Sequence, residues 1–158
     1  MITINLEETN GIKNLDKIGE QTGRNLVHLA GLNTQEEVER RTPEDVGHLK
    51  NSWFVEDNQS SSQFRLYNSR KYAPFVEEGT GVYGPSNKPI LPKTKKVLAW
   101  KPSKKGLKYA NKNGWVFAKS VKGQKGVHMA EKSIEATTKR IKDLAITAVM
   151  AASEGKGV

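Results

Sequence analysis

The sequence predicts an α+β fold, with a mainly antiparallel sheet flanked by an N-terminal helix and a long C-terminal helix. Apolar residues recur at helical spacing near both ends of the chain, whereas short strand-like segments bounded by turn-forming residues fill the middle. Separate runs of helix and strand are typical of α+β domains. We expect one domain over residues 1–152, since 158 residues suffice for one core, with a long basic loop region over residues 79–125. A flexible tail is expected over residues 153–158.

The N-terminal part is predicted to hold a short strand and a helix. Apolar and polar residues alternate over residues 2–6, as in a half-buried edge strand. From Thr9 or Asn10, which can cap a helix, apolar residues recur every three or four positions. This pattern predicts an amphipathic helix that ends near Gly31.

A separate short helix is expected directly afterwards. Thr34 and Glu37 have the spacing of a capping box, which predicts a new helix start. This helix is expected to run to Arg41 and to end because of Pro43.

Five segments in the middle of the chain are predicted to be strands. They are residues 53–57, 63–67, 72–76, 97–100 and 115–118. The first two flank a turn-prone run of polar residues and should form a hairpin. Pro74 lacks a backbone N–H, so the third should be an edge strand or carry a bulge. Three glycines and three prolines over residues 79–92 predict a long exposed loop, into which Gly79 lets the chain turn.

A long amphipathic helix is predicted over about residues 127–152. We expect it to pack on the sheet, as the N-terminal helix does. Its predicted apolar face consists of Ile134, Ile141, Leu144, Ala145, Ala148 and Ala152.

Positive charge is concentrated in the middle of the chain. The net charge is +9, and residues 79–130 contain twelve lysines but no Asp or Glu. The other residues include 14 Lys and Arg against 17 Asp and Glu, so they are slightly acidic. The twelve lysines are Lys88, Lys93, Lys95, Lys96, Lys101, Lys104, Lys105, Lys108, Lys112, Lys119, Lys122 and Lys125.

Three interpretations of these lysines are compatible with the sequence. They form an ordinary solvated surface, they contact nucleic-acid phosphates, or they dock onto an acidic neighbouring subunit. Trp100, Tyr109 and Trp115 lie among them, as in surfaces on which bases stack. No arginine occurs between residues 71 and 139, which argues against base-specific readout and leaves non-specific phosphate contact open.

The composition gives no sign of a metal site, a disulfide or a membrane segment. The chain has no cysteine, and His28, His48 and His128 lack the spacing of metal ligands. No segment is apolar enough to span a membrane, and the first residues do not resemble a signal peptide. We therefore expect a protein made in the cytoplasm, without metal or cofactor.

The sequence also lacks the usual signatures of an enzyme. Glu77 and Glu78 would point to opposite faces of a strand, so they would not form an acid–base pair. The closely spaced glycines of residues 79–84 are followed by prolines and not by the helix that a phosphate-binding loop needs. We expect no catalytic residue.

Three segments, in fixed order, carry a family resemblance: residues 41–52 (RTPEDVGHLKNS), residues 72–80 (YAPFVEEGT), and Gly126 with Met129 and Ala130 at the end of the basic loop. They resemble the head–tail joining, or tail-completion, proteins of tailed bacteriophages, which show D-T-G-x-L-x-x-S, then Y-A-x-x-V-E-x-G-T, then a closing helix. The resemblance covers about residues 10–150. The matching positions are Asp45, Gly47, Leu49, Ser52, Tyr72, Ala73, Val76, Glu77, Gly79 and Thr80.

The sequence departs from the family pattern at two places. Val46 stands where the family has Thr, and no proline precedes the closing helix. The first segment is expected to form a turn, which Asp45 or Thr42 can cap. Gly47 allows an unusual backbone conformation there, and Leu49 can anchor the next strand.

The resemblance implies a structural subunit at the head–tail junction of a phage. Such a chain assembles with copies of itself into a ring, expected to be a hexamer, in the neck of the virion. The ring surrounds the DNA channel between the capsid portal and the tail. Its neighbours would be head-completion, tail-terminator or tail-tube proteins, and it would be made in the host cytoplasm.

The alternative is a free-standing protein that binds nucleic acid without sequence preference. The lysines expected to face DNA or an adjacent ring are Lys88, Lys93, Lys95, Lys96, Lys101, Lys104, Lys105 and Lys108.

Overall fold

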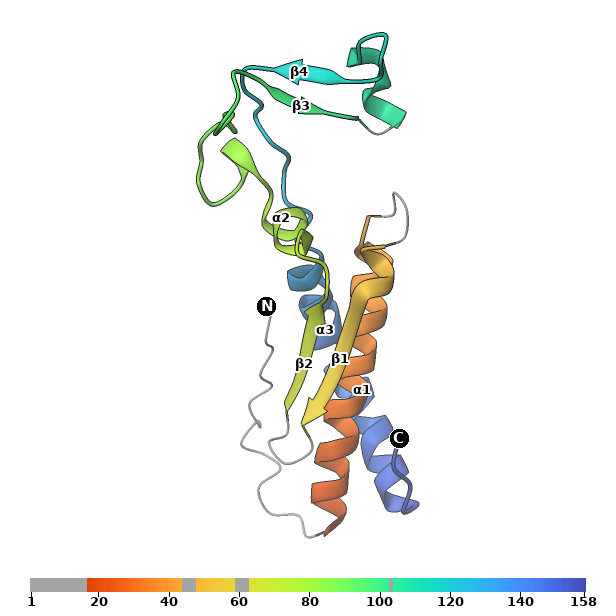
Figure 1. The fold of residues 1–158 in the computed structure, drawn as a ribbon. Coiled ribbons are helices and arrows are strands. Elements are labelled where there is room, and N and C mark those ends of the chain that lie inside the picture. The colour runs from red at the N-terminus through yellow and green to blue at the C-terminus, as the bar shows by residue number, and fades with distance from the viewer. Residues whose placement is uncertain (1–16, 44–47, 59–62, 103) are drawn as a thin grey trace. The chain divides into compact units, whose positions relative to one another are not determined.

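The computed structural model describes residues 17–43, 48–58, 63–102 and 104–158. Within these ranges the chain has an N-terminal helix, two small antiparallel sheets and a long C-terminal helix, which confirms the α+β class (Figure 1). The predicted strand over residues 2–6 and the predicted helix start at Thr9 or Asn10 lie outside the described residues.

The chain forms two compact units where we expected one domain. Unit 1 comprises the described residues up to Ala73 together with His128–Val158, and unit 2 comprises Pro74–Val127. The four described strands accordingly form two separate two-stranded sheets, one in each unit, and not a single sheet.

The first helix, α1 (Lys17–Arg41), runs without a break through the position where we predicted its end. Gly31 does not end the helix but lets another segment pack closely, because a Cβ there would lie 2.9 Å from Cγ1 of Val55. Thr34 does not cap a new helix, since its hydroxyl donates to the carbonyl of Ala30 at 2.7 Å. The predicted break between two helices is therefore wrong.

The end of α1 at Arg41, two residues before Pro43, is confirmed. Thr42 closes the last turn, because its hydroxyl donates to the carbonyl of Val38 at 2.6 Å. The same hydroxyl accepts the indole N–H of Trp53 at 2.9 Å. One side chain thus fixes both the helix end and the start of the first strand.

The first predicted hairpin is confirmed as β1 (Trp53–Asn58) and β2 (Gln63–Asn68), which pair antiparallel. Side chains alternate between the two faces, and one face packs on α1. The outer face carries Phe54 and Tyr67, whose rings stack with centroids 5.5 Å apart. The residues buried on the inner face are Trp53, Phe64 and Leu66.

The predicted C-terminal helix is confirmed as α3 (Met129–Ser153). We expected it to pack on the sheet, but it packs mainly against α1. Of its predicted apolar face, Ala148 and Ala152 are buried. The remaining members are only half-buried: Ile134, Ile141, Leu144 and Ala145. In the first half of the helix the buried positions are instead held by Met129, Ala130 and polar residues.

The interface between α1 and α3 is polar near its middle. The hydroxyls of Thr34 and Thr137 lie 2.9 Å apart and are both buried. Ser133 is also buried, and its hydroxyl donates to the carbonyl of Met129 at 2.5 Å. These short side chains form their hydrogen bonds within the helix pair. Polar residues can therefore be buried at this position, where apolar residues were predicted.

Residues beyond α3 contact the other helix of unit 1. The side-chain amide of Asn25 donates to the carbonyl of Lys156 at 3.1 Å, within the segment that we predicted as a tail. No helix in the described ranges has both the length and the apolar character that crossing a bilayer would require.

The short helix α2 (Ala73–Glu78) replaces the strand predicted over residues 72–76, so that prediction is wrong. Pro74 lies in its first turn, where the missing N–H has no helical partner to lose. Pro74 is therefore not in the edge strand that we predicted. Glu77 is buried and Glu78 is exposed. Neighbouring residues of a helix point about 100° apart, so these two carboxyl groups still diverge.

The rest of unit 2 is mostly loop, as predicted for residues 79–92, with one 3₁₀ turn at Gly81–Tyr83. The last two predicted strands are confirmed as β3 (Leu98–Trp100) and β4 (Val116–Ala118), which pair antiparallel. A 3₁₀ helix, Lys104–Tyr109, lies between them.

Candidate functional site

Unit 2 is strongly basic. It holds all twelve lysines of the middle region against two acidic residues, Glu77 and Glu78, which gives a net charge of +10. Every lysine side chain described in this unit is exposed, and none of them forms an ion pair with a described carboxylate. The side chains of Lys104 and Lys105 lie outside the described residues. The six other predicted contact residues are all exposed: Lys88, Lys93, Lys95, Lys96, Lys101 and Lys108.

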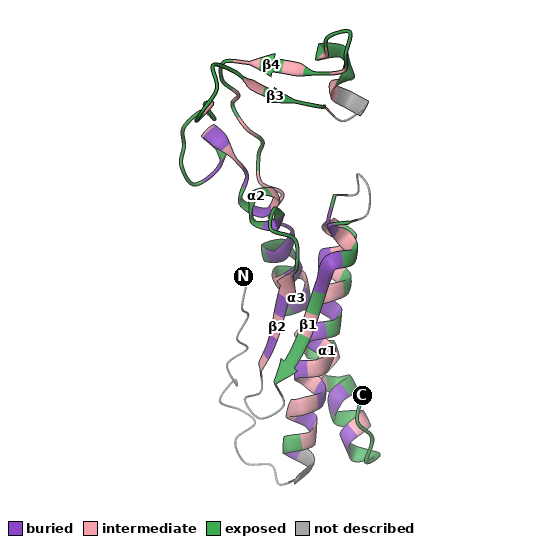
Figure 2. Cartoon of the chain, in the orientation of Figure 1, coloured by how far each residue is buried: buried purple, intermediate pink, exposed green. Residues whose placement is uncertain are grey.

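The same unit exposes its apolar side chains. None of the apolar side chains described between Pro74 and Val127 is buried, and the buried residues there are Glu77 and three glycines (Figure 2). Exposed apolar surface of this extent is typical of sites that contact another macromolecule. The large exposed side chains are Phe75, Tyr83, Ile90, Leu91, Val97, Trp100, Leu107, Tyr109, Trp115 and Phe117.

Two segments of unit 2, residues 76–84 and 121–127, are joined backbone to backbone; we call them the clasp. The bonds run from Thr80 N to Gln124 O (2.8 Å), from Val82 N to Lys122 O (2.8 Å) and from Val127 N to Val76 O (2.9 Å). The hydroxyl of Thr80 also accepts the backbone N–H of Gln124 at 3.0 Å. The clasp closes the loop region between these segments.

The clasp depends on glycines because its two backbones approach too closely for a side chain. A Cβ at Gly126 would lie 2.4 Å from the carbonyl oxygen of Glu77, and one at Gly123 would lie 2.0 Å from that of Thr80. Gly79 has φ of +87°, which confirms its predicted role in turning the chain. A Cβ on Gly79 would also lie 2.6 Å from the nitrogen of Gly126, a contact that the sequence alone did not reveal.

The first group of residues that carry the resemblance lies at the start of the β1–β2 hairpin in unit 1. Leu49 is buried, and the hydroxyl of Ser52 donates to the carbonyl four residues earlier at 2.6 Å. That hydroxyl accepts Nε of Arg70 at 2.9 Å, so it ties the two ends of the hairpin together. Asp45 and Gly47 lie outside the described residues.

The second group of residues that carry the resemblance, within residues 72–80, leads into the clasp. Tyr72 is exposed, whereas Ala73 and Glu77 are buried. The remaining members belong to the clasp through their backbones: Val76, Gly79 and Thr80. Two of the segments on which the resemblance rests, this one and the one that contains Gly126, are therefore in contact.

Three aromatic rings of unit 2 have a lysine ammonium over one face. The distances from Nζ to the ring centroid are 5.6 Å for Lys101 and Trp115, 4.9 Å for Lys108 and Tyr109, and 5.9 Å for Lys125 and Tyr83. Such contacts contribute about 0.5–1 kcal/mol each at exposed sites. The sequence singled out Tyr109 and Trp115 but missed Tyr83, which the clasp brings close to Lys125.

No arrangement for metal chemistry forms within the described ranges, where no three His, Asp or Glu side chains converge. His28 Nδ1 pairs with the carboxylate of Asp57, and His128 Nδ1 lies 3.2 Å from that of Glu131. His48 is exposed and offers its backbone carbonyl to Ser52. The rings of His28 and His128 therefore pair with two different carboxylates, and these are not shared.

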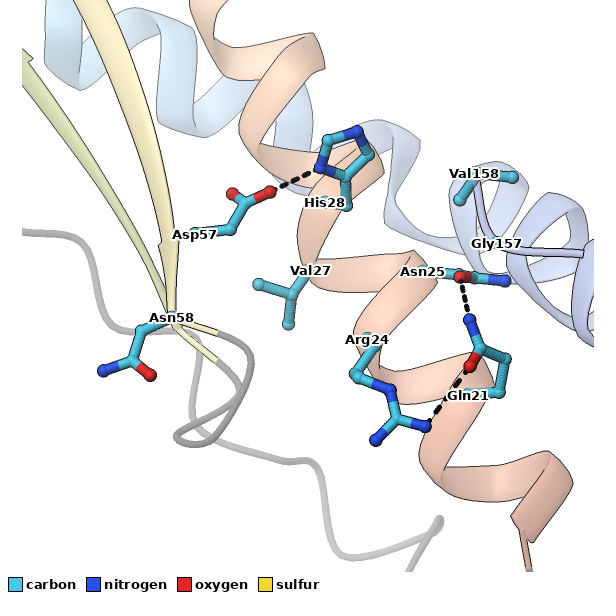
Figure 3. A pocket seen from close by; sticks show the side chains of 9 residues that line it. All are labelled: Gln21, Arg24, Asn25, Val27, His28, Asp57, Asn58, Gly157 and Val158. Carbon is cyan, nitrogen blue, oxygen red and sulfur yellow. Dashed lines mark hydrogen bonds and ion pairs between the residues drawn. The ribbon is translucent and has the colours of Figure 1, made fainter.

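A pocket of about 300 Å³ lies in unit 1 (Figure 3). Its polar groups bond one another: Gln21 donates to Asn25 at 2.8 Å, and Arg24 donates to Gln21 at 3.2 Å. Because these groups are engaged within the protein, we assign the pocket no ligand. It is lined by Gln21, Arg24, Asn25, Val27, His28, Asp57, Asn58, Gly157 and Val158.

Comparisons with known proteins gave no relative from which a function could be transferred. No protein-family model, no curated protein and no solved structure matches this chain.

Proposed function

We propose that the chain is a structural subunit of a phage head–tail junction, in a tail-completion or neck ring that connects the capsid portal to the tail around the DNA channel. The role is mechanical, and the proposal includes no catalytic residue, metal or cofactor. One observation carries it: unit 2 exposes ten large apolar side chains, buries none in its described part, and has a net charge of +10.

The lack of buried apolar side chains in unit 2 favours a role in assembly. Burying a large apolar side chain contributes about 1.5–3 kcal/mol, and unit 2 forgoes this contribution while the chain is alone. Aromatic side chains are enriched at the centres of protein–protein interfaces. We infer that neighbouring copies, or an adjacent ring of head-completion, tail-terminator or tail-tube proteins, cover the exposed apolar side chains of unit 2 apart from Trp115 and Phe117.

The charge of unit 2 favours a ring around an anion. Copies of a unit with a charge of +10 repel one another when they are brought together, unless negative charge lies between them. DNA in a central channel supplies that charge through its phosphates, and lysine contacts to phosphates carry no sequence information. An acidic adjacent ring would supply it equally. The residues assigned to either contact are Lys88, Lys93, Lys95, Lys96, Lys101, Lys104, Lys105 and Lys108.

The contacts among the three resemblance segments add support. The hydroxyl of Thr42, in the first segment, lies 3.5 Å from the sulfur of Met129, in the third. The second segment meets Gly126, also of the third, in the clasp. Contacts between these segments are what a shared structural role of the three would require, so they support the proposal.

Cryo-electron microscopy of the virion that carries this chain tests the proposal. We expect density for the chain in a ring between the portal and the tail, with six copies around the DNA channel. Density in the capsid shell or at the tail tip would contradict the joining role.

A second candidate function is a free-standing protein that binds nucleic acid without sequence preference, which the three lysine-capped rings favour. Binding of duplex DNA by the isolated chain, measured at about 50 and 200 mM salt, separates the two. A neck subunit should bind duplex weakly before it assembles. Tight duplex binding that falls steeply with salt would favour the free-standing protein.

A further inference from the structure

Two aromatic residues at the β3–β4 hairpin, Trp115 and Phe117, are two positions apart, and a lysine lies beside the first. The ladder pairs Ala99 with Phe117 and ends at Trp100 and Val116, so Lys101 follows β3 and Trp115 precedes β4 by one residue each. The ammonium of Lys101 accordingly lies 5.6 Å from the centre of the Trp115 ring. The strand pairing itself therefore builds this arrangement.

This ring-bearing face is the more open of the two. Phe117 is 54% exposed and Trp115 is 38% exposed. Ala99, opposite Phe117, is small and exposed, so it leaves the neighbourhood of that ring free. On the other face Leu98, Val116 and Ala118 are half-buried, and Trp100 is 37% exposed.

The spacing of the two rings suits consecutive bases of an extended strand. Trp115 and Phe117 are two residues apart along one strand direction, which separates their Cα atoms by about 6.6 Å. Sheets that bind single-stranded nucleic acid use aromatic side chains on one face in this way, each stacking on a base. Any base can stack, so such a surface needs no arginine for readout.

The turn that leads into this face is held in place before any ligand arrives. The side-chain oxygen of Asn111 accepts the backbone N–H groups of Asn113 and Trp115 at 3.0 and 2.9 Å. The backbone N–H of Asn111 donates to the carbonyl of Trp115 at 2.8 Å. Lys112 lies within this turn and Lys119 follows β4, so further ammonium groups flank the rings along the chain.

We propose that this face of the β3–β4 hairpin binds single-stranded nucleic acid, with bases stacked on Trp115 and Phe117 and phosphates contacted by Lys101. The bases of a duplex already stack on one another, so a duplex would contact the lysines through its phosphates and would not stack on the rings. This activity goes beyond the proposed neck function, which involves duplex DNA, and the two can fail separately.

Fluorescence anisotropy of a labelled oligothymidylate with the full chain at low salt tests this inference, with a duplex of equal length as the comparison. The variant Trp115→Leu/Phe117→Leu removes both rings and keeps apolar side chains in the strand. We expect its affinity for the single strand to fall roughly tenfold or more per ring, with little change for the duplex.

Three further variants serve as controls. Trp115→Phe keeps a ring at that position and should retain most of the single-strand affinity. Phe75→Leu removes a ring that is 59% exposed elsewhere in unit 2 and should leave the affinity unchanged. Lys101→Gln should reduce the slope of log affinity against log salt concentration by about 0.7 for a single strand.

Several results would overturn the inference. If single strand and duplex bound equally well and the ring variants had no effect, lysine contacts to phosphates would account for all of the binding. Absence of single-strand binding by the full chain at low salt would exclude the activity. A changed oligomeric mass of the double variant, without any change in single-strand affinity, would assign the rings to a contact between copies.

Discussion

Leu66 in unit 1 is fully buried, whereas Leu91 in unit 2 is 62% exposed, and this contrast extends to the two units as wholes. Unit 1 encloses Trp53, Phe64 and Met129 together with Leu66 among α1, α3 and the β1–β2 hairpin. Unit 2 buries no apolar side chain in its described part and relies on the clasp and a short β3–β4 ladder.

This difference determines how each unit should respond to stress. A buried apolar side chain contributes about 1.5–3 kcal/mol, whereas a typical hydrogen bond contributes about 0.5–1.5 kcal/mol net. Unit 2 should therefore open locally at a lower free energy than unit 1, and exchange its backbone amides faster. Any further stability of unit 2 would have to come from surfaces that cover it.

The largest expected effect comes from truncating the buried leucine of unit 1. Leu66→Ala should lower the free energy of unfolding by about 2–5 kcal/mol, because it removes a packed side chain and leaves a cavity. Leu91→Ala, the matched change in unit 2, should alter it by less than about 0.5 kcal/mol. Urea unfolding followed by circular dichroism measures both. Similar losses for the two variants would contradict the contrast between the units.

The next effect concerns the clasp. Gly126→Ala should open unit 2 because the new Cβ would lie 2.4 Å from the carbonyl oxygen of Glu77. We expect hydrogen exchange over residues 76–84 and 121–127 to accelerate at least about tenfold, equivalent to ~1.4 kcal/mol, while α1 and α3 stay protected.

Gly114→Ala is the matched control for the clasp. Gly114 lies in the same unit with φ of +76°, yet a Cβ there would meet nothing within 4 Å. This variant carries backbone strain alone and should leave exchange in the clasp unchanged. If both variants loosened the clasp equally, close packing of glycine would not explain how unit 2 is held.

A smaller effect is expected at the polar seam of unit 1. Thr34→Val and Thr137→Val each break the 2.9 Å contact between the two hydroxyls, and each should cost about 1 kcal/mol in unfolding free energy. The double variant should cost less than the sum, because replacing both partners leaves no unpaired group. Additive losses in the double-mutant cycle would show that the two hydroxyls act independently.

The smallest effect tests the exposed face of unit 1. A hydrogen bond to Glu56 raises the pKa of Tyr67 above its ordinary value, because the carboxylate favours the protonated phenol. This contribution to stability is present below the pKa of unfolded tyrosine and is lost as pH rises through the higher folded pKa. Glu56→Gln should lower the pKa of Tyr67, as read from tyrosinate absorbance in a pH titration. An unchanged titration curve would mean that Glu56 does not raise the pKa of Tyr67.

Periodicity predicted the elements whose side chains alternate regularly. The hairpin strands and the helix Met129–Ser153 were confirmed on this basis. The break at Gly31 was wrong because a glycine that permits close packing looks, in sequence, like one that ends a helix. The strand over residues 72–76 was wrong because Pro74 suits an edge strand and a first helical turn equally well.

The candidate site was predictable in its charge and not in its geometry. The run of lysines without acidic residues is visible in the sequence. The pairing of Lys101 with Trp115 depends on strand register, which joins positions 14 residues apart only once β3 and β4 are paired. The exposure of Phe117 was equally hidden, because an apolar residue in a strand gives no sign of whether anything covers it.

The backbone hydrogen bond between Val76 and Val127 brings the two ends of a long segment together. Because the backbone N–H of Val127 donates to the carbonyl of Val76, residues 77–126 form an insertion in the sequence of unit 1 whose two ends meet. Insertions with adjoining ends can be lengthened, shortened or exchanged without redirecting the chain that carries them. Changes in the length or sequence of this insertion should therefore leave α1, α3 and the β1–β2 hairpin of unit 1 in place.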